Sequence, residues 1–275
     1  LAILHYRQAV EQSPDYADAH YNLSQALLLK GDFRNGWSEY EWRLKKDDAT
    51  LVDGPRWDGM PLGGRALVIT AEQGIGDQVM FASCIPDLLG RAGGSLILEC
   101  EPRLLPLFKR SFPRILVREQ SPLTELMKAF VHVPIGSLPG MFRQSEAAFP
   151  DKRRQYLVPD QGKTAAWRER YQSLDGKLKI GISWRGGKDA LAQKTRSTTL
   201  QDWLPLLQTK HAFINLQYGD CNDELRKLEK DTGIEIHDWP EVDPLTDLDE
   251  FCAQIAALDL VISIDNSTLH LAGAL

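Results

Sequence analysis

Short apolar runs alternate with amphipathic stretches in the first half of the chain. The runs at residues 66–70, 96–100 and 115–117 have the length and composition of buried strands. The stretches at 78–89 and 103–112 repeat apolar residues at helical spacing. Strands that alternate with helices usually form a parallel sheet with crossover helices, so we predict one α/β half here.

A second series of the same kind begins at residue 179. Apolar runs and helical stretches again alternate, in the order strand 179–184, helix 200–208, strand 212–217, helix 222–232, strand 234–236, helix 248–257, strand 260–264 and a helix from residue 267. The residues that join the two series are charged and partly helical. We therefore predict two Rossmann-like domains, in which a ligand would bind at the carboxyl ends of the strands.

The start of the chain has a different pattern, an internal repeat. A shift of 34 residues lays Ala2 on Gly36 and Tyr6 on Tyr40, which is the period of a tetratricopeptide repeat. The segment 14–33 between them closely resembles the tetratricopeptide consensus. These residues build helices and carry no visible chemistry, so their role is predicted to be structural.

The repeat segment is too short to bury its own apolar faces, because such arrays need about three units to be stable. Its last predicted helix, at about 35–44, is rich in aromatic residues: Trp37, Tyr40 and Trp42. We predict that this helix docks on the domain that follows.

These patterns divide the chain into three parts. We expect a partial tetratricopeptide segment at 1–50, an N-terminal Rossmann-like domain at 51–160 and a C-terminal Rossmann-like domain at 161–275. The chain starts at Leu1 without a methionine and ends at Leu275 inside a helical pattern that no Gly or Pro caps. We therefore expect a fragment whose last domain is truncated.

Composition and charge exclude several classes of protein. With 43% hydrophobic and 25% charged residues, the chain has enough apolar material for a folded core. The formal net charge of −6 argues against a nucleic-acid binder, which usually gathers a basic excess. No apolar window is long enough to span a membrane, and no signal peptide opens the chain, so we expect a soluble cytoplasmic protein. Cysteine spacing agrees with a reducing compartment, since no CxxC pair occurs among Cys84, Cys100, Cys221 and Cys252.

Three loops at predicted strand ends carry the residues that could do chemistry. The first follows residues 66–70 and contains Gly74, Gly76 and Asp77. Its glycines let the backbone turn and approach a ligand, although the third glycine of a dinucleotide-binding fingerprint is absent. Asp77 could cap the next helix or serve as a carboxylate base, and both roles are compatible.

The second loop, after residues 179–184, brings flexible glycines and cations together. Lys188, Lys194 and Arg196 would suit a diphosphate, and the alternative is a solvated polar loop.

The third loop is 265–270. Ser267 and Thr268 could cap a helix whose N-terminus faces an anion, and the alternative for its histidine is simple packing.

Together the loops resemble a known group of enzymes. The Gly-x-Gly-Asp turn at 74–77 is similar to that of heptosyltransferase-type glycosyltransferases. The runs 181–184, 215–219 and 265–274 look like those of bacterial tetratricopeptide proteins with a glycosyltransferase module akin to that class and to O-GlcNAc transferase. The resemblance covers nearly the whole chain. It implies an α/β fold of the GT-B type: a pair of Rossmann-like domains, the second of which holds the donor nucleotide, preceded by an α-helical tetratricopeptide segment.

The resemblance also implies an activity and roles for individual residues. The activity is inverting transfer of a hexosyl or heptosyl group from a nucleotide-sugar to an acceptor hydroxyl. Asp77 corresponds to the catalytic base. The residues implied at the donor and its phosphates are Gly74, Gly76, Trp184, Lys188, Lys194, Arg196, Gln217, Asp265, Asn266, Ser267, Thr268 and His270.

We expect no metal, and no cofactor apart from the nucleotide-sugar co-substrate. No Asp-x-Asp motif stands in a strand-end loop, because Asp247 and Asp249 open an amphipathic helix and are typical of a helix cap. The charge of the leaving group would instead be stabilised by the helix end at Ser267 and by basic side chains.

Two alternatives to an enzyme stay open. The chain could bind a nucleotide-sugar without turnover, or it could be a scaffold whose repeats recruit a partner. For an enzyme, the repeats suggest a peptide or protein acceptor by analogy with O-GlcNAc transferase. The sequence does not indicate the donor nucleotide, the sugar or the acceptor.

Overall fold

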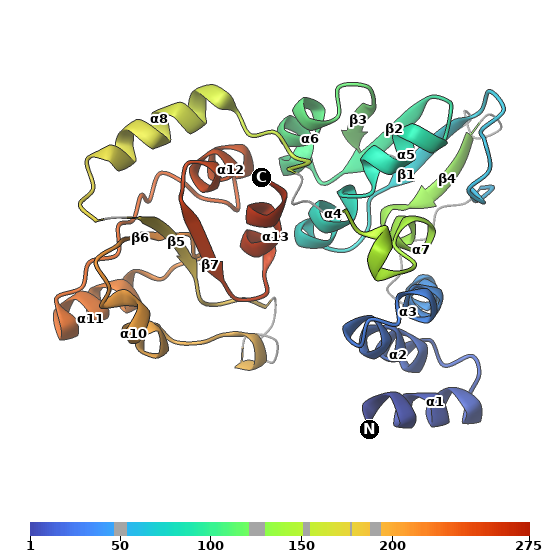
Figure 1. Cartoon of the computed structure of the whole chain (residues 1–275), viewed down its shortest axis with the longest axis horizontal. Coiled ribbons are helices and arrows are strands. Elements are labelled where there is room, and N and C mark those ends of the chain that lie inside the picture. Colours follow the sequence, from blue (N-terminus) through green and yellow to red (C-terminus); the bar gives the residue numbers. More distant parts are fainter. Residues whose placement is uncertain (47–53, 121–129, 151–154, 177, 188–193) are drawn as a thin grey trace. The chain divides into compact units, whose positions relative to one another are not determined.

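The structure is a computed structural model that describes residues 1–46, 54–120, 130–150, 155–176, 178–187 and 194–275 (Figure 1). The chain divides into two compact units. The first comprises Leu1–Glu101 and Arg114–Arg154, and the second comprises Pro102–Pro113 and Gln155–Leu275.

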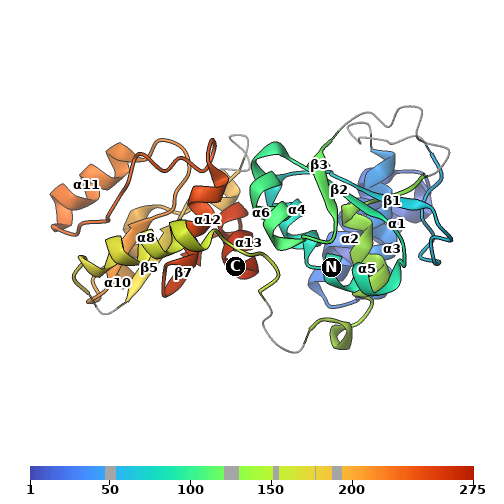
Figure 2. The same cartoon turned by 90° about the horizontal axis from the view of Figure 1, so that it is seen from above.

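The first unit contains a parallel sheet with the order β3-β2-β1-β4. Its strands are β1 (Ala66–Thr70), β2 (Leu96–Cys100), β3 (Leu116–Glu119) and β4 (Phe130–Pro134). Figure 2 shows β3, β2 and β1 side by side. The first three confirm the predicted strands, whereas β4 was not predicted from the sequence. β1 lies between β2 and β4, and its residues 67–70 are buried, as expected of a continuous apolar run in a parallel sheet that helices cover on both faces.

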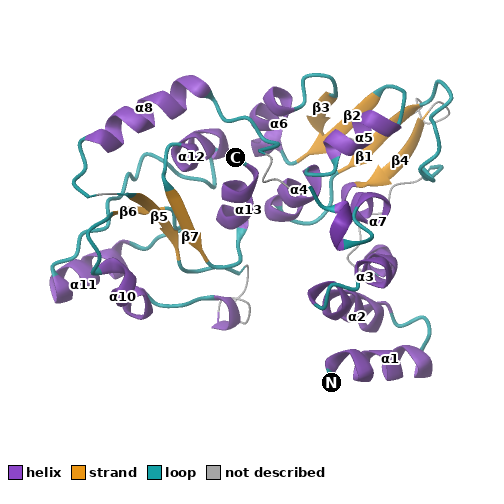
Figure 3. Ribbon diagram, viewed as in Figure 1, coloured by secondary structure: helices purple, strands orange, loops and turns teal. Residues whose placement is uncertain are grey.

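The helix predicted at 78–89 is wrong in its extent. The structure has two helices there, α4 (Ile75–Ala82) and α5 (Ile85–Arg91) (Figure 3). Pro86 lies in the first turn of α5. A proline has no N–H to donate and clashes with the preceding turn, so α4 cannot run on through this position.

The repeat segment forms α1 (Ala2–Gln12), α2 (Ala17–Leu29) and α3 (Phe33–Tyr40), followed by the 3-10 helix η1 (Glu41–Lys45). Helix α2 packs against both α1 and α3. The contact with α3 is close at Gly36, where a Cβ atom would lie 2.7 Å from Leu28 Cγ. The small residue that the repeat pattern places at Gly36 is therefore required by helix packing.

The predicted docking of the aromatic helix is confirmed for two of its three aromatic residues. The Trp37 indole donates a hydrogen bond to the Arg143 carbonyl at 2.9 Å. Tyr40 is 4% exposed, and its ring lies 6.0 Å from that of Phe81 in α4. Trp42 instead stacks on His20 of α2, with ring centroids 3.7 Å apart, so it stabilises the repeat itself.

The second unit contains a parallel sheet with the order β6-β5-β7, formed by β5 (Lys179–Ser183), β6 (Ala212–Asn215) and β7 (Leu260–Ser263). The strand predicted at 234–236 is wrong, because this segment makes only an isolated parallel bridge between His237 and Ile214. That bridge lies beside β6, so the order of segments repeats that of the first sheet. Both units therefore share one order of parallel segments.

Helices cover both faces of this second sheet (Figure 1). They are α8 (Gln161–Gln172), α10 (Leu204–Leu207) after η6 (Leu200–Trp203), α11 (Asn222–Thr232), α12 (Leu248–Ala256) and α13 (Ser267–Ala274). The second unit also includes η2 (Pro102–Leu104) and α6 (Leu105–Ser111), which follow β2 in the chain. Arg110 of α6 pairs with Asp249 of α12 at 2.5 Å. The compact units therefore do not follow the order of the sequence.

Two expectations from composition can be compared with the structure. Cys84, Cys100, Cys221 and Cys252 are free and buried, as predicted. Burial raises the pKa of the Cys84 thiol to about 11, so this side chain is a neutral apolar filler at neutral pH. Among the described residues, no helix combines the length and apolarity that a membrane crossing demands.

The docking of the repeat segment generates a stability prediction. Tyr40→Ala removes a buried ring and should lower the free energy of unfolding by about 3–5 kcal/mol, whereas Tyr40→Phe should cost only about 1 kcal/mol. The control is Tyr16→Ala, because Tyr16 lies in the same segment and is 53% exposed; we expect a change within about 0.5 kcal/mol. Urea titration followed by circular dichroism measures all three. Equal losses for the two alanine variants would contradict the docking.

Candidate functional site

The loop between β1 and α4 holds Asp77 in a fixed orientation. Gly74 is the N-cap residue of α4, and its backbone N–H donates to Asp77 Oδ2 at 3.0 Å. Asp77 is thus not the N-cap residue. It is the third residue of the helix, and its carboxylate accepts a hydrogen bond from the backbone N–H of the N-cap residue. Its other oxygen, Oδ1, makes no hydrogen bond with any residue that the structure describes. One carboxylate oxygen is used by the helix, and the second is left for another partner.

The backbone of this loop is strained just before the cap. Gln73 has a φ of 60°, in the left-handed region that residues other than glycine seldom adopt. Its side-chain amide lies 2.9 Å from the Tyr40 hydroxyl oxygen, to which Nε2 donates. A conformation of this kind costs about 1–3 kcal/mol and persists only when its surroundings hold it.

The loop after β5 is tied together by the amide of Gln217. Gln217 Oε1 accepts hydrogen bonds from the backbone N–H groups of Trp184 at 3.0 Å and Arg185 at 2.7 Å. Its Nε2 donates to the carbonyls of Arg185 and Tyr218. Gln217 was predicted at the donor, but its polar atoms already hold the loop, and only 7% of the residue is exposed.

Trp184 was also predicted at the donor, and the structure shows where its side chain lies. Its side chain is fully buried in the core of the second sheet, beside Ile182 and Phe213. The indole N–H donates to Glu224 Oε2 at 3.1 Å. A ring without exposed surface cannot stack on a ligand, so only the backbone of Trp184 is left for the predicted donor contact, which stays a prediction.

The predicted cations are only partly described. Lys188 lies outside the described residues, whereas Lys194 and Arg196 have exposed side chains. Gly186, in the same loop, faces the loop after β7. A Cβ atom there would lie 2.9 Å from Ile264 Cδ1 and 3.4 Å from Asn266 Cβ, so glycine allows the two loops to approach.

Asn266 caps α13, which corrects the prediction that Ser267 or Thr268 does so. Asn266 Oδ1 accepts from the N–H groups of Thr268 at 3.0 Å and Leu269 at 3.4 Å. Its Nδ2 donates to Ser183 Oγ in β5 at 2.8 Å and to the Arg185 carbonyl at 3.3 Å, which joins the loop after β7 to the loop after β5. Thr268 is fully buried. The cap therefore occupies two of the amides that the prediction assigned to an anion.

His270 and Asp265 lie near each other at the start of α13. His270 Nε2 is 3.8 Å from Asp265 Oδ1, so the two side chains form an ion pair when the histidine is protonated. The Asp265 side chain is 73% exposed and that of His270 is 27% exposed. Both are accessible to a ligand at the carboxyl edge of the second sheet.

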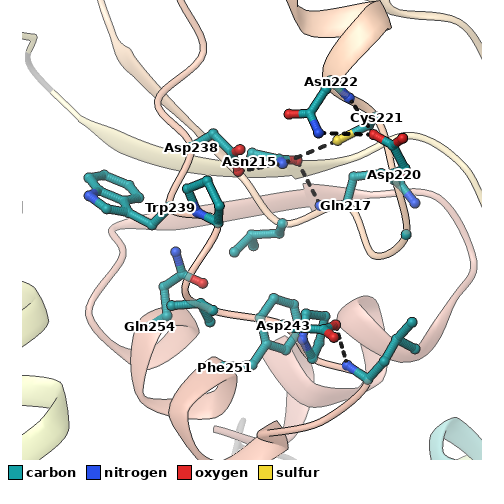
Figure 4. A pocket seen from close by; sticks show the side chains of 16 residues that line it. Asn215, Gln217, Asp220, Cys221, Asn222, Asp238, Trp239, Asp243, Phe251 and Gln254 are labelled. Atoms are coloured by element: carbon teal, nitrogen blue, oxygen red, sulfur yellow. Dashed lines mark hydrogen bonds between the residues drawn. The ribbon is translucent and has the colours of Figure 1, made fainter.

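A pocket of about 300 Å³ opens at this same edge, and sequence reasoning missed it (Figure 4). Its lining residues come from the end of β6, from the segment after His237 and from α12; they include Asn215, Gln217, Asp220, Asp238, Trp239, Asp243, Phe251 and Gln254. Of these, only Gln217 was predicted. The sequence signal that could have located this pocket is the Asp238-Trp239-Pro240 run, which follows His237 and the segment 234–236.

The lining of the pocket sets the kind of group that it can hold. Asp238 Oδ1 accepts a hydrogen bond from Asn215 Nδ2 at 2.8 Å, and Trp239 and Phe251 supply aromatic surface. The lining contains aspartates but neither lysine nor arginine. It therefore suits a flat neutral ring with N–H donors better than a phosphate.

A metal site is not visible in the part of the chain that the structure describes. No cluster of three or more His, Cys, Asp or Glu side chains with the geometry to hold an ion occurs there. Asp247 is the N-cap of α12 and accepts from the N–H of Glu250 at 2.9 Å, as its sequence pattern predicted.

Comparisons with known proteins match the start of the chain to a repeat family and most of the chain to one relative. The family described as TPR repeat matches residues 1–31. The protein FlbA of Caulobacter vibrioides is 35% identical over 97% of this chain. The match covers 49% of FlbA, so the chain spans about half the length of this relative.

Solved structures show the fold. The glycosyl transferase family 9 protein of Veillonella parvula matches with a TM-score of 0.52 at 9% identity, over 81% of this chain and 80% of that one. The iron-containing dodecameric heptosyltransferase TibC, solved with ADP-D-beta-D-heptose, matches with a TM-score of 0.50 at 12% identity, over 84% of this chain and 60% of that one. The chain thus has a mixed α/β fold with parallel sheets similar to those of these glycosyltransferases.

The role of Gln217 in joining the loops can be tested by truncation. Gln217→Ala leaves the buried N–H groups of Trp184 and Arg185 without their acceptor, which should lower the free energy of unfolding by about 1–3 kcal/mol. Gln208→Ala makes the same change at an exposed position of the same unit and should shift it by less than about 0.5 kcal/mol. Urea unfolding distinguishes the two. A Gln217 variant as stable as the control would show that the loop does not need this amide.

Proposed function

We propose that the chain is the glycosyltransferase part of a larger protein and transfers a sugar, with inversion and without a metal, from a nucleotide-sugar to an acceptor hydroxyl. The observation that carries this proposal is the free oxygen of Asp77 at the carboxyl edge of a parallel sheet. The fold similarity to glycosyl transferase family 9 supports it.

The capped carboxylate of Asp77 supplies the base. The hydrogen bond from Gly74 fixes Oδ2, so Oδ1 keeps a constant direction. In the proposed step, Oδ1 takes the proton from the acceptor hydroxyl while that oxygen attacks the anomeric carbon. The bond from this carbon to the donor phosphate oxygen breaks, and the nucleoside diphosphate leaves with the bonding electrons.

The second unit supplies the donor site. We place the nucleoside base in the pocket lined by Trp239 and Asp238, where a carboxylate can accept its N–H groups. The diphosphate then lies along the loops after β5 and β7, which reach the same edge of the sheet.

Charge on the leaving diphosphate needs compensation. Because Asn266 already accepts from two amides of α13, the helix end can donate less than a free N-terminus. We therefore assign more of the compensation to Lys194 and Arg196, whose side chains are exposed. Lys188 has the same predicted role and lies outside the described residues.

The acceptor side follows from the repeats. Because tetratricopeptide helices build surfaces for other chains, a peptide or protein acceptor is proposed.

A second function, nucleotide-sugar binding without turnover, is favoured by one observation. Capping of α4 alone accounts for the presence of Asp77, so the carboxylate does not need to be a base.

Asparagine at position 77 separates the two functions. Asp77→Asn keeps an oxygen that accepts from Gly74, so stability should change by less than about 1 kcal/mol, whereas turnover should fall about 10²–10⁴-fold with donor affinity unchanged. The donor is first chosen by thermal shift from UDP-, GDP-, ADP- and dTDP-sugars. Turnover is then measured as release of the nucleoside diphosphate.

A matched control exists in the second unit, where Asp202 Oδ2 accepts from the Thr199 N–H at 2.9 Å in the same kind of cap. Asp202→Asn should leave turnover unchanged. Retained turnover in Asp77→Asn together with loss in Asp77→Ala would assign Asp77 to capping alone.

Metal independence is tested with a chelator. Because Lys194, Arg196 and the start of α13 are assigned to the leaving group, turnover should be the same with and without excess EDTA, within about 2-fold. Loss of turnover in EDTA and its return with Mn²⁺ would contradict this assignment. Thermal unfolding in EDTA shows in parallel whether the chelator affects the fold.

A further inference from the structure

Arg43 of the repeat segment reaches the end of the first sheet. It lies in η1, only 5% of the residue is exposed, and its guanidinium holds Glu72 with two hydrogen bonds. Nε donates to Glu72 Oε2 at 2.9 Å, and Nη2 donates to Oε1 at 2.7 Å. Glu72 comes directly before Gln73 in the loop between β1 and α4. A residue of the repeat segment is therefore hydrogen-bonded to the loop that precedes Asp77.

The same guanidinium also holds the loop after β4. Arg43 Nη2 donates to Ser137 Oγ at 2.8 Å, and Glu72 Oε1 accepts from the Gly136 N–H at 2.8 Å. A Cβ atom on Gly136 would lie 2.7 Å from Glu72 Oε1 and 3.2 Å from Arg43 Nη2, so glycine is required for this approach. Three chain segments thus meet at one buried ion pair.

Neighbouring acidic groups keep Arg43 charged. Burial alone would lower the pKa of Arg43, but the hydrogen bonds and charge of Glu72 and the charge of Glu41 leave it above its ordinary value. Burial would likewise raise the pKa of Glu41, but Arg43 and Arg56 bring it below its ordinary range. A bidentate, charge-assisted pair of this kind fixes direction as well as distance.

Tyr40 adds a second contact from the repeat to the same loop. Its hydroxyl meets the Gln73 amide, the residue with a φ of 60°. The Arg43 guanidinium carbon lies 4.6 Å from the centre of the Tyr40 ring, so the two contacts support each other. Consecutive loop residues, Glu72 and Gln73, are therefore both held by the repeat segment.

We propose that Arg43 and Tyr40 are positioning residues, through which the repeat segment holds the β1–α4 loop and so orients the Asp77 carboxylate. The part of this inference that concerns turnover rests on the proposed function. The part that concerns the loop does not. The repeat then has two roles, because the surface that packs on the first unit also sets the geometry of the base.

The experiment replaces the ion pair without leaving a buried charge. The double variant Arg43→Gln with Glu72→Gln is neutral; glutamine matches glutamate in volume and is smaller than arginine. Hydrogen–deuterium exchange of the peptide covering residues 71–79 should become at least about 10-fold faster, since the loop loses its bidentate hold. With an active donor, kcat should fall about 10–100-fold while the donor KM stays within about 2-fold. Arg43→Lys, which keeps the charge but not the fork, should lie between wild type and the double variant.

The matched control is the pair Arg143 and Asp87, which are 2.6 Å apart in the same unit. Arg143 is also 5% exposed and joins the end of α7 to Asp87 in α5 and to the Ser83 carbonyl at the end of α4, and it makes no described hydrogen bond to the β1–α4 loop. Arg143→Gln with Asp87→Asn should leave exchange of residues 71–79 and kcat unchanged. Tyr40→Phe is a milder variant that keeps the ring and loses the Gln73 contact, and it should speed exchange of the same peptide by about 2–5-fold.

The outcomes separate this inference from the proposed function. If the Arg43 and Tyr40 variants fold and exchange of residues 71–79 equals that of wild type, the inference is wrong. Exchange that rises equally in the Arg143 control also overturns it, since the effect would then be general loosening. Faster exchange confined to the Arg43 and Tyr40 variants supports the inference, whether or not the wild-type protein consumes a donor. Failure of the wild-type protein to consume any donor would count against the proposed function alone.

Discussion

The buried ion pair between Arg43 and Glu72 is the contact on which the first unit depends. It joins the repeat, the loop after β1 and, through Ser137, the loop after β4. A charge at 5% exposure is stable only when its hydrogen-bonding groups are satisfied, and removal of one partner leaves the other uncompensated. The pair therefore adds little to net stability but strongly favours one arrangement of the three segments.

The second unit joins its loops with neutral amides instead. Gln217 links the loops after β6 and β5, and Asn266 links those after β7 and β5. Each amide both donates and accepts, so one side chain satisfies several backbone groups without burying a charge. This leaves Lys194 and Arg196 exposed and uncommitted among the described contacts, as a polar ligand at that edge requires.

Periodicity predicted most strands and helices because apolar spacing reflects burial directly. It missed β4, whose His132 and Pro134 interrupt the apolar run, and it extended a helix through Pro86. The three loops of the predicted site follow β1, β5 and β7, as periodicity indicated. The sequence could not show that Trp184 is buried, or that the side-chain amides of Gln217 and Asn266 are hydrogen-bonded to the backbone. These features depend on partners that are distant in the sequence. Arg43 carries no local signal at all.

Asp77 shows why capping and catalysis need not compete. A helix cap uses one carboxylate oxygen and requires that it stay in place, and a general base needs a second oxygen whose direction is constant. The cap therefore supplies the preorganisation that proton transfer needs. Because Gln73 precedes this cap in a strained conformation, the direction of Oδ1 depends on whatever holds Gln73. In this chain that support comes from Tyr40, so the folding of the repeat and the orientation of the carboxylate are physically coupled.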